Sequence, residues 1–180
     1  MTELLLSRRD VDFMLFEWLD AAALTAAPRY AEHSRETFAA VLDSCARLAE
    51  EKFAPHYQKS DREEPRFDGV RVQLIDEIKV ALAAFVDSGL MCATQDHAHG
   101  GMQLPTLIEK AALTWLYAAN IGTCAYPLLT VANARLLLAH GSAAQIATFA
   151  EPQLRGEWFG TMCLSEPQAG SSLSDIATRA

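Results

Sequence analysis

The spacing of apolar residues predicts a mainly helical chain. Between Ser34 and Phe53, apolar residues recur at steps of three and four, which places them along one face of a helix of about five turns. Charged residues fill the positions between them and form a solvated face. The same spacing predicts further helices over residues 8–24, 68–88, 106–119, 127–139 and 142–151.

Helix boundaries are marked by residues that favour starts and stops. We expect Pro28 and Pro55 to end the first two helices, because proline cannot continue a helix. Gly89 stands where a glycine commonly ends a helix. Capping boxes, in which a hydroxyl and an acidic or amide side chain satisfy the first backbone N–H groups, are expected at Thr106 with Glu109 and at Ser142 with Gln145.

Two polar segments interrupt the helices. Residues 54–69 carry mixed charges and one proline, which predicts a surface connection. Residues 90–104 contain His97 and His99, which from an extended strand would both point at a zinc ion. No third ligand completes a tetrahedral set, so we favour a polar loop turning through Gly100-Gly101 and expect no metal site.

The pattern changes after Gly156. Trp158 to Leu164 is a strand-like apolar run, and it breaks into Ser165-Glu166-Pro167 and then Ala169-Gly170-Ser171-Ser172. Glycine permits positive φ and close approach of a ligand, and successive backbone N–H groups in such a turn form an anion site. The pattern therefore predicts a phosphate-binding turn at the end of a strand.

Together these elements predict a mainly α fold: a bundle of about six helices that ends at the first strand of a truncated β domain, because helices first and strands later indicate segregated layers. A lone strand is unstable by itself, so the remainder of the β domain is expected elsewhere. The 180 residues are 51% hydrophobic, enough for an ordinary core.

The charge balance narrows the range of partners. A formal charge of −8 without a basic stripe argues against nucleic acid or an anionic membrane surface. The four cysteines show no Cys-x-x-Cys spacing, and Cys45 and Cys163 are interpreted as small buried apolar residues in a reducing compartment. The N-terminal residues lack a signal-peptide pattern, and no apolar segment approaches the ~20 residues of a membrane span. We expect a cytoplasmic protein.

The run from Cys163 to Ser171, Cys-Leu-Ser-Glu-Pro-x-Ala-Gly-Ser, resembles the first signature of the acyl-CoA dehydrogenase flavoproteins. The order of the preceding elements resembles the start of the same family, including Gly100-Gly101 and the stretch from His140 to Glu157. The leading helix, residues 8–24, is similar to the N-terminal extension of longer members, among them the 3-methylmercaptopropionyl-CoA dehydrogenases.

The resemblance implies roles for individual residues. Met162, Leu164 and Ser165 would lie along the flavin ring of FAD, with the Ser165 hydroxyl hydrogen-bonded near N5 and O4. Gly170 and Ser171 would lie at the FAD pyrophosphate, and Ser171 also near the phosphates of the CoA substrate. The family usually has Asp where Ser172 stands here, which puts the flavin affinity in question and leaves the fold unaffected.

The resemblance also implies an organisation and an activity. Residues 1–30 would be the N-terminal extension, 31–157 the helical domain and 158–180 the start of the middle β domain. The reaction would be α,β-dehydrogenation of an acyl-CoA, with electron-transfer flavoprotein as acceptor and a homo-oligomeric enzyme. The family's catalytic base lies in a C-terminal domain, so no catalytic residue is assigned here, Glu166 included, and the chain alone is expected to be inactive.

Two alternatives stay open at this point. The chain would be a short non-catalytic scaffold or binding module that assembles with a separate chain, or an unrelated all-α protein in which the Ser-Glu-Pro turn is coincidental. Residues downstream of Ala180 would discriminate between them.

Overall fold

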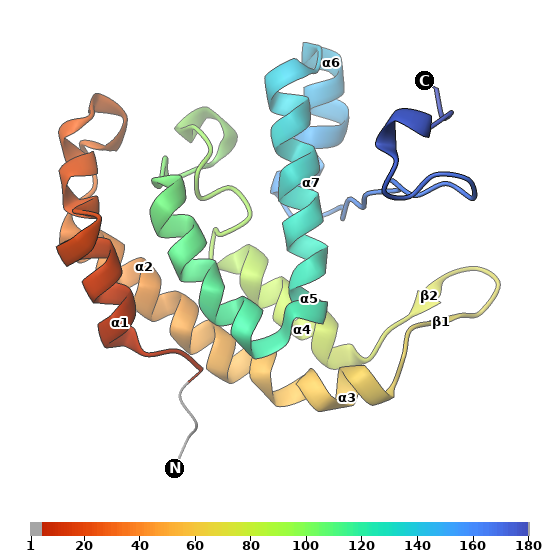
Figure 1. Cartoon of the computed structure of the whole chain (residues 1–180), viewed down its shortest axis with the longest axis horizontal. Coiled ribbons are helices and arrows are strands. Elements are labelled where there is room, and N and C mark those ends of the chain that lie inside the picture. Colours follow the sequence, from red (N-terminus) through yellow and green to blue (C-terminus); the bar gives the residue numbers. More distant parts are fainter. Residues whose placement is uncertain (1–4, 180) are drawn as a thin grey trace.

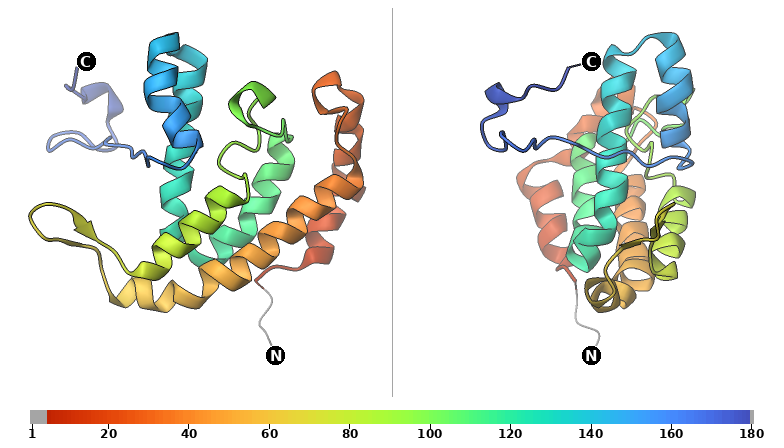
Figure 2. Two further views of the ribbon diagram at one scale, coloured as in Figure 1. Left: turned by 180° about the vertical axis from the view of Figure 1, so that it is seen from behind. Right: turned by 90° about the vertical axis from the view of Figure 1, so that its right-hand side faces the viewer.

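The computed structural model describes residues 5–179, and the mainly helical fold class is confirmed. The helices pack into one bundle, while the hairpin of β1, Arg66–Phe67, and β2, Val72–Gln73, and the C-terminal segment project from the same side of it (Figures 1 and 2). The residues before Leu5, on which the absence of a signal-peptide pattern partly rests, lie outside the described part of the chain.

The N-terminal segment is less regular than its spacing predicts. Helix α1, Arg8–Asp12, continues into a π-helical turn, Phe13–Trp18, and then breaks at Asp20, whose φ of 45° is left-handed. Two 3-10 turns follow, Ala21–Ala26 and Pro28–Tyr30. The prediction of one helix over 8–24 with Trp18 packed inward is wrong, because the break ends the apolar stripe and Trp18 is 71% exposed.

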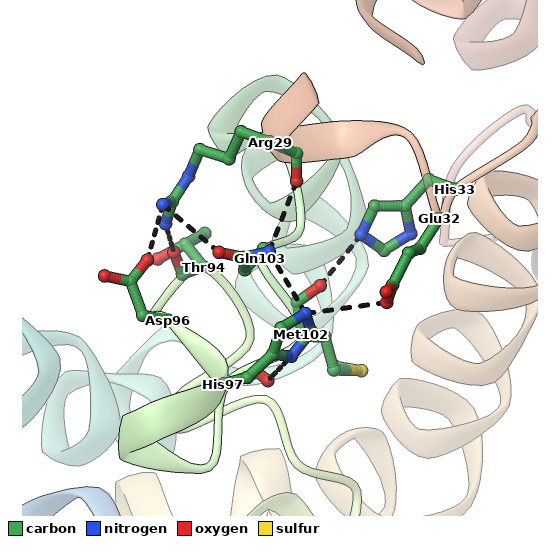
Figure 3. Close-up of polar contacts among 9 residues, drawn as sticks. Arg29, Glu32, His33, Thr94, Asp96, His97, Met102 and Gln103 are labelled. Atoms are coloured by element: carbon green, nitrogen blue, oxygen red, sulfur yellow. Dashed lines mark hydrogen bonds and ion pairs between the residues drawn. The ribbon is translucent and has the colours of Figure 1, made fainter. Parts of the chain in front are cut away.

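Polar contacts attach this N-terminal segment to the loop of residues 90–104, which follows helix α4, Asp76–Asp87 (Figure 3). Arg29 pairs with Asp96 and donates from Nη2 to the Thr94 carbonyl at 3.1 Å. One imidazole nitrogen of His33 lies 2.8 Å from the Met102 carbonyl oxygen. The loop therefore has a second support besides the core.

Helix α2, Arg35–Leu48, carries the apolar face that the sequence predicts. It continues through a π-helical turn, Ala49–Phe53, and a 3-10 turn, Ala54–His56, into α3, Tyr57–Arg62. Pro55 therefore does not end the helical path, because proline at the start of a helical turn loses no hydrogen bond. The face buried in the core contains Phe38, Leu42, Cys45, Ala49 and Phe53.

A short hairpin replaces the start of the next predicted helix. Strands β1, Arg66–Phe67, and β2, Val72–Gln73, pair antiparallel, and α4 runs over Asp76–Asp87. The Asp68 carboxylate accepts the N–H groups of Val70 and Arg71 at 2.9 Å each, and Gly69 supplies the φ of 96° that the turn needs. The prediction of a helix from 68 with Val72 inward is wrong, and Val72 is exposed.

Helix α5, Thr106–His140, consists of two halves that meet at Asn120. The backbone there is extended, with φ −164° and ψ 86°, and the two halves form a V (Figure 1). The Asn120 side chain accepts the Thr123 N–H at 3.1 Å and donates to the Phe53 carbonyl at 3.3 Å. The break lies where the sequence predicts it, but the second half begins directly after Asn120 and contains Pro127.

By length and composition, α5 would suffice to cross a membrane, which the sequence prediction of no such segment did not anticipate. The helix is bent at Asn120, and residues of both halves belong to the core, among them Leu116 and Val131. Core helices of globular proteins pass the same test of length and composition.

The two predicted capping boxes have different outcomes. Ser142 and Gln145 cap the helical segment formed by α6, Ala143–Gln145, a π-helical turn, Ile146–Ala150, and α7, Glu151–Leu154. The box at Thr106 is absent, because Pro105 occupies the N-cap position and Glu109 is buried against Arg135. The predicted helix 142–151 is thus confirmed with a later end.

The predicted strand Trp158–Leu164 forms no strand ladder among the described residues. The chain after Trp158 runs in irregular conformation to an isolated bridge between Glu166 and Ala169, and a 3-10 turn covers Leu173–Asp175. A strand needs hydrogen-bonding partners, and the described residues offer none beside this segment. The domain boundaries expected at residues 30 and 157 stay predictions.

Candidate active-site wall

The irregular C-terminal segment is attached to the second half of α5 where it crosses it. The Gly160 N–H donates to Thr130 Oγ1 at 2.9 Å, and the rings of Tyr126 and Phe159 pack edge to face with centroids 6.3 Å apart. A Cβ atom at Gly160 would lie 3.2 Å from Gln153 Oε1, so a larger residue is disfavoured at this crossing. The segment is thereby placed before it reaches the Ser-Glu-Pro turn.

The residues that the resemblance assigns to the flavin ring lie exposed on this segment. Met162 is 60% and Leu164 42% exposed, and Ser165 is also exposed. Neighbouring exposed apolar side chains are typical of a surface that binds a ligand or another part of a protein. Met162, Leu164 and Ser165 therefore lie on one exposed segment, although that segment is not a strand.

The turn after Ser165 presents backbone donors. Within the described residues, the N–H groups of Gly170, Ser171 and Ser172 donate to no other group, whereas those of Glu166 and Ala169 are bonded across the turn at 2.8 and 3.1 Å. A Cβ atom at Gly170 would meet nothing within 4 Å, so its surroundings are open. Gly170 does not have a positive φ, so of the two properties that glycine offers here only close approach of a ligand applies.

Glu166 organises the turn. Its carboxylate accepts the backbone N–H groups of Ala177 and Thr178 at 2.9 and 2.8 Å, and it also contacts the Thr178 hydroxyl and Gln168. These donors, the Ala177 N–H foremost, lower the pKa of Glu166 to about 2. A carboxylate held in this way is a poor proton acceptor, which agrees with assigning Glu166 a structural role.

Cys45 and Cys124 are buried, Cys92 is half-buried and Cys163 is exposed. Burial raises the pKa values of Cys45 and Cys124 to about 12, so both are inert thiols. Cys163 is exposed, and the prediction that it is a buried apolar residue is wrong, because the segment that carries it is not covered by a sheet.

A cavity of about 70 Å³ lies between α4 and the two halves of α5. Its walls are largely apolar, with Leu113 and Leu116 from the first half and Leu128 and Val131 from the second. The bend at Asn120 creates this arrangement, because it folds the two halves of α5 toward each other.

One end of the cavity is charged. Glu109, whose side chain is 2% exposed, accepts a hydrogen bond from Arg135 Nη2 at 2.8 Å, and the same nitrogen donates to Thr94 Oγ1 at 2.6 Å. No local sequence pattern predicted this pair. Arg135 interrupts an otherwise apolar helix, and that interruption was the available signal.

Of the two histidines in the loop of residues 90–104, His97 is engaged in contacts with neighbouring protein groups. His97 Nδ1 lies 3.0 Å from the Gly101 carbonyl oxygen, and His97 Nε2 lies 3.0 Å from Gln103 Nε2 and 3.5 Å from a Glu32 carboxylate oxygen (Figure 3). Within residues 5–179, no group of three or more His, Cys, Asp or Glu side chains is arranged to hold a metal ion.

The domain model and the relatives that match this chain all belong to acyl-CoA dehydrogenases. The model of the acyl-CoA dehydrogenase N-terminal domain matches residues 35–157. The chain is 35% identical over 171 residues to a 3-methylmercaptopropionyl-CoA dehydrogenase of Ruegeria pomeroyi, covering 93% of this chain and 29% of the relative.

Two further relatives point the same way. A butyryl-CoA dehydrogenase of Syntrophomonas wolfei is 27% identical, covering 95% of this chain and 28% of the relative, and a broad-specificity linear acyl-CoA dehydrogenase of Mycobacterium tuberculosis is 28% identical, covering 96% and 28%. The chain spans under a third of the length of these relatives. From the match to the domain model, the chain belongs to the acyl-CoA dehydrogenase family.

Proposed function

We propose that this chain forms one wall of the flavin and acyl-CoA site of an FAD-dependent acyl-CoA dehydrogenase. The observation that carries the proposal is the run of open backbone N–H groups at Gly170–Ser172, which directly follows the exposed residues Met162 and Leu164. This order suits a cofactor that has an apolar ring system at one end and phosphates at the other.

The residues present fit FAD. Gly170 and Ser171 would hold the pyrophosphate through backbone N–H groups, without the need for a lysine. Met162 and Leu164 would cover the ring, and the Ser165 hydroxyl would donate to its polar edge, where a donor stabilises developing negative charge. The bound flavin would supply the hydride acceptor for α,β-dehydrogenation of the thioester. Ser171 would also contact the phosphates of CoA.

The acyl chain would enter beside the second half of α5. The cavity between the two halves of that helix supports this, because its walls are apolar and lie on the element that the C-terminal segment crosses at Thr130. A catalytic base is not assigned, since the pKa of Glu166 is about 2 and its oxygens are engaged by Ala177 and Thr178. The base would come from outside this chain, which alone would be inactive.

The remaining expectations about the whole enzyme are part of the same proposal. Electrons would pass to an electron-transfer flavoprotein, the enzyme would be a homo-oligomer, and it would be cytoplasmic. The relatives' names support only the acyl-CoA substrate and the dehydrogenase activity.

The proposal is tested by separating the N–H of residue 171 from its hydroxyl. In the flavin-loaded protein that contains this chain, Ser171→Pro removes the N–H donor and we expect at least a tenfold loss of FAD affinity, measured by equilibrium dialysis. Ser171→Ala keeps the N–H and is the matched control, with FAD affinity within threefold of the parent protein, roughly the effect of one exposed hydroxyl. Equal FAD affinity in both variants would contradict the proposed site.

A further inference from the structure

The cavity between the two halves of α5 is lined mostly by apolar side chains but also by three charged ones. Leu113 and Val131 are among the apolar lining residues, while Glu109, Lys110 and Arg135 line the same space. These groups are paired with one another, but a plain alkyl chain would make no hydrogen bond to the polar atoms that face the cavity, and covering such atoms without a partner costs free energy.

The pair at the end of the cavity has unused hydrogen-bonding capacity. Glu109 Oε1 accepts from Arg135, but Glu109 Oε2 is buried and accepts no hydrogen bond. The Lys110 ammonium lies 3.1 Å from Oε2, as an ion pair without the alignment of a hydrogen bond. Of the Arg135 guanidinium, only Nη2 donates to described residues, to Glu109 and Thr94. Among the described residues, Glu109 Oε2 therefore has an ion-pair partner but no hydrogen-bond donor, and the Arg135 guanidinium has N–H groups that donate to no residue.

The Arg135 guanidinium is held in place by the loop that contains Thr94. Thr94, which accepts from Arg135 through its hydroxyl, accepts from Arg29 through its carbonyl, and Arg29 is paired with Asp96 (Figure 3). Because these contacts fix the loop that supports Arg135, the charged end is preorganised and does not depend on ligand binding to form.

We propose that this cavity, whose volume of about 70 Å³ admits only the last few atoms of a chain, receives the far end of the acyl chain and selects one that ends in a hydroxyl group. A hydroxyl both donates and accepts, so it would donate to Glu109 Oε2 and accept from Arg135. A terminal carboxylate would pair with Arg135 and Lys110, but it has no proton to donate to Glu109 Oε2 and would place like charge beside that oxygen. A terminal methyl group would satisfy neither residue. The inference rests on the proposed acyl-CoA dehydrogenase function and names its substrate class.

The first test compares thioesters of matched size on the flavin-loaded protein that contains this chain. We expect ω-hydroxyacyl-CoA to be oxidised with a kcat/KM at least about tenfold above that of the alkyl thioester with the same number of chain atoms, for example 5-hydroxypentanoyl-CoA against hexanoyl-CoA. Glutaryl-CoA, with a terminal carboxylate, should be no better than hexanoyl-CoA. Equal or higher kcat/KM for the alkyl or carboxylate thioester at every chain length would overturn the inference.

The second test uses the neutral double variant Glu109→Leu with Arg135→Leu, which avoids leaving one buried charge without its partner. We expect the hydroxyl preference to disappear and hexanoyl-CoA to be favoured, with Arg47→Met, an exposed change on α2, as the control that keeps the preference. A preserved hydroxyl preference in the double variant would overturn the assignment to these residues.

The same measurements distinguish failure of the proposed substrate class from failure of the proposed function. Oxidation of alkyl thioesters without a hydroxyl preference overturns the inference and leaves the proposed function intact. Failure to oxidise any of the thioesters overturns the proposed function and the inference with it. Circular dichroism shows whether the double variant folds. If it does not, Glu109→Gln, which keeps the volume of the side chain, is measured in its place. We expect this variant to show a reduced hydroxyl preference, and an unchanged preference would contradict the inference.

Discussion

Replacing Asn120 by alanine tests whether one side chain sets the bend between the two halves of α5. The side chain is 1% exposed, and it accepts the Thr123 N–H while donating to the Phe53 carbonyl. Thr123 is itself buried, so its N–H would be left without a partner. The bend determines how the walls of the cavity face each other, and the variant therefore probes both stability and site.

The magnitude follows from the two hydrogen bonds. Loss of a helix cap costs about 1 kcal/mol, and a buried group left unpaired costs about 1–3 kcal/mol. We expect Asn120→Ala to lower the free energy of unfolding by about 2–4 kcal/mol, which corresponds to a fall in Tm of roughly 5–15 °C for a chain of this size. Asn120→Ser keeps a capping oxygen but does not reach the Phe53 carbonyl, so about half of the loss is expected.

The assay is urea unfolding of the purified protein, followed by far-ultraviolet circular dichroism. Thr114→Ala, an exposed change on the first half of α5, is the control and should alter the free energy of unfolding by no more than about 0.5 kcal/mol. The reasoning would be refuted if Asn120→Ala cost no more than this control, because the bend would then be held by other contacts.

Three further predictions test other parts of the structure. Gly101→Ala should lower the free energy of unfolding by about 2–4 kcal/mol in the same assay, because its Cβ would lie 2.0 Å from the Gln95 carbonyl oxygen. Gly170→Ala, in open space, should leave the free energy of unfolding nearly unchanged, and similar losses in both variants would contradict this packing. The pKa of Glu166 is lowered from 4.5 to about 2, so its stabilisation of the turn is fully present above pH 4.5 and is lost as the pH falls through about 2. The amide NMR shifts of Ala177 and Thr178 should follow this titration in the parent protein but not in Glu166→Gln. A thiol reagent should modify exposed Cys163 in a fast phase that Cys163→Ser abolishes, while buried Cys45 and Cys124 react only after unfolding; fast modification of either buried thiol would be inconsistent with the core described here.

Local apolar spacing predicted the helices better than their boundaries. The inward face of α2 follows from its period of three and four, which depends only on neighbouring residues. The hairpin at 66–73 was missed although Asp68-Gly69 is a recognised turn signal, because the apolar residues around it were assigned to a helix. The strand at 158–164 was expected from composition, yet a strand exists only when another strand pairs with it.

The candidate site was predictable only where its residues are contiguous. Met162 to Ser171 form one stretch with a family signature, so their roles were assigned from the sequence and remain to be tested. Glu109 was placed in a capping box with Thr106, three positions away, whereas its partner is Arg135, 26 positions away. Such a pairing depends on the bend at Asn120, and no local pattern reveals which side chains a bend brings together.

The most direct test of the account is anaerobic mixing of an acyl-CoA thioester with the flavin-loaded protein that carries this chain, followed by the flavin absorbance. We expect rapid bleaching by hexanoyl-CoA and ω-hydroxyacyl-CoA, slowed at least about tenfold in flavin-loaded Ser165→Ala, because the donor at the flavin edge is lost. Residues 1–180 alone should oxidise no thioester. The proposed function is wrong if no acyl-CoA thioester reduces the flavin, or if residues 1–180 alone turn over an acyl-CoA.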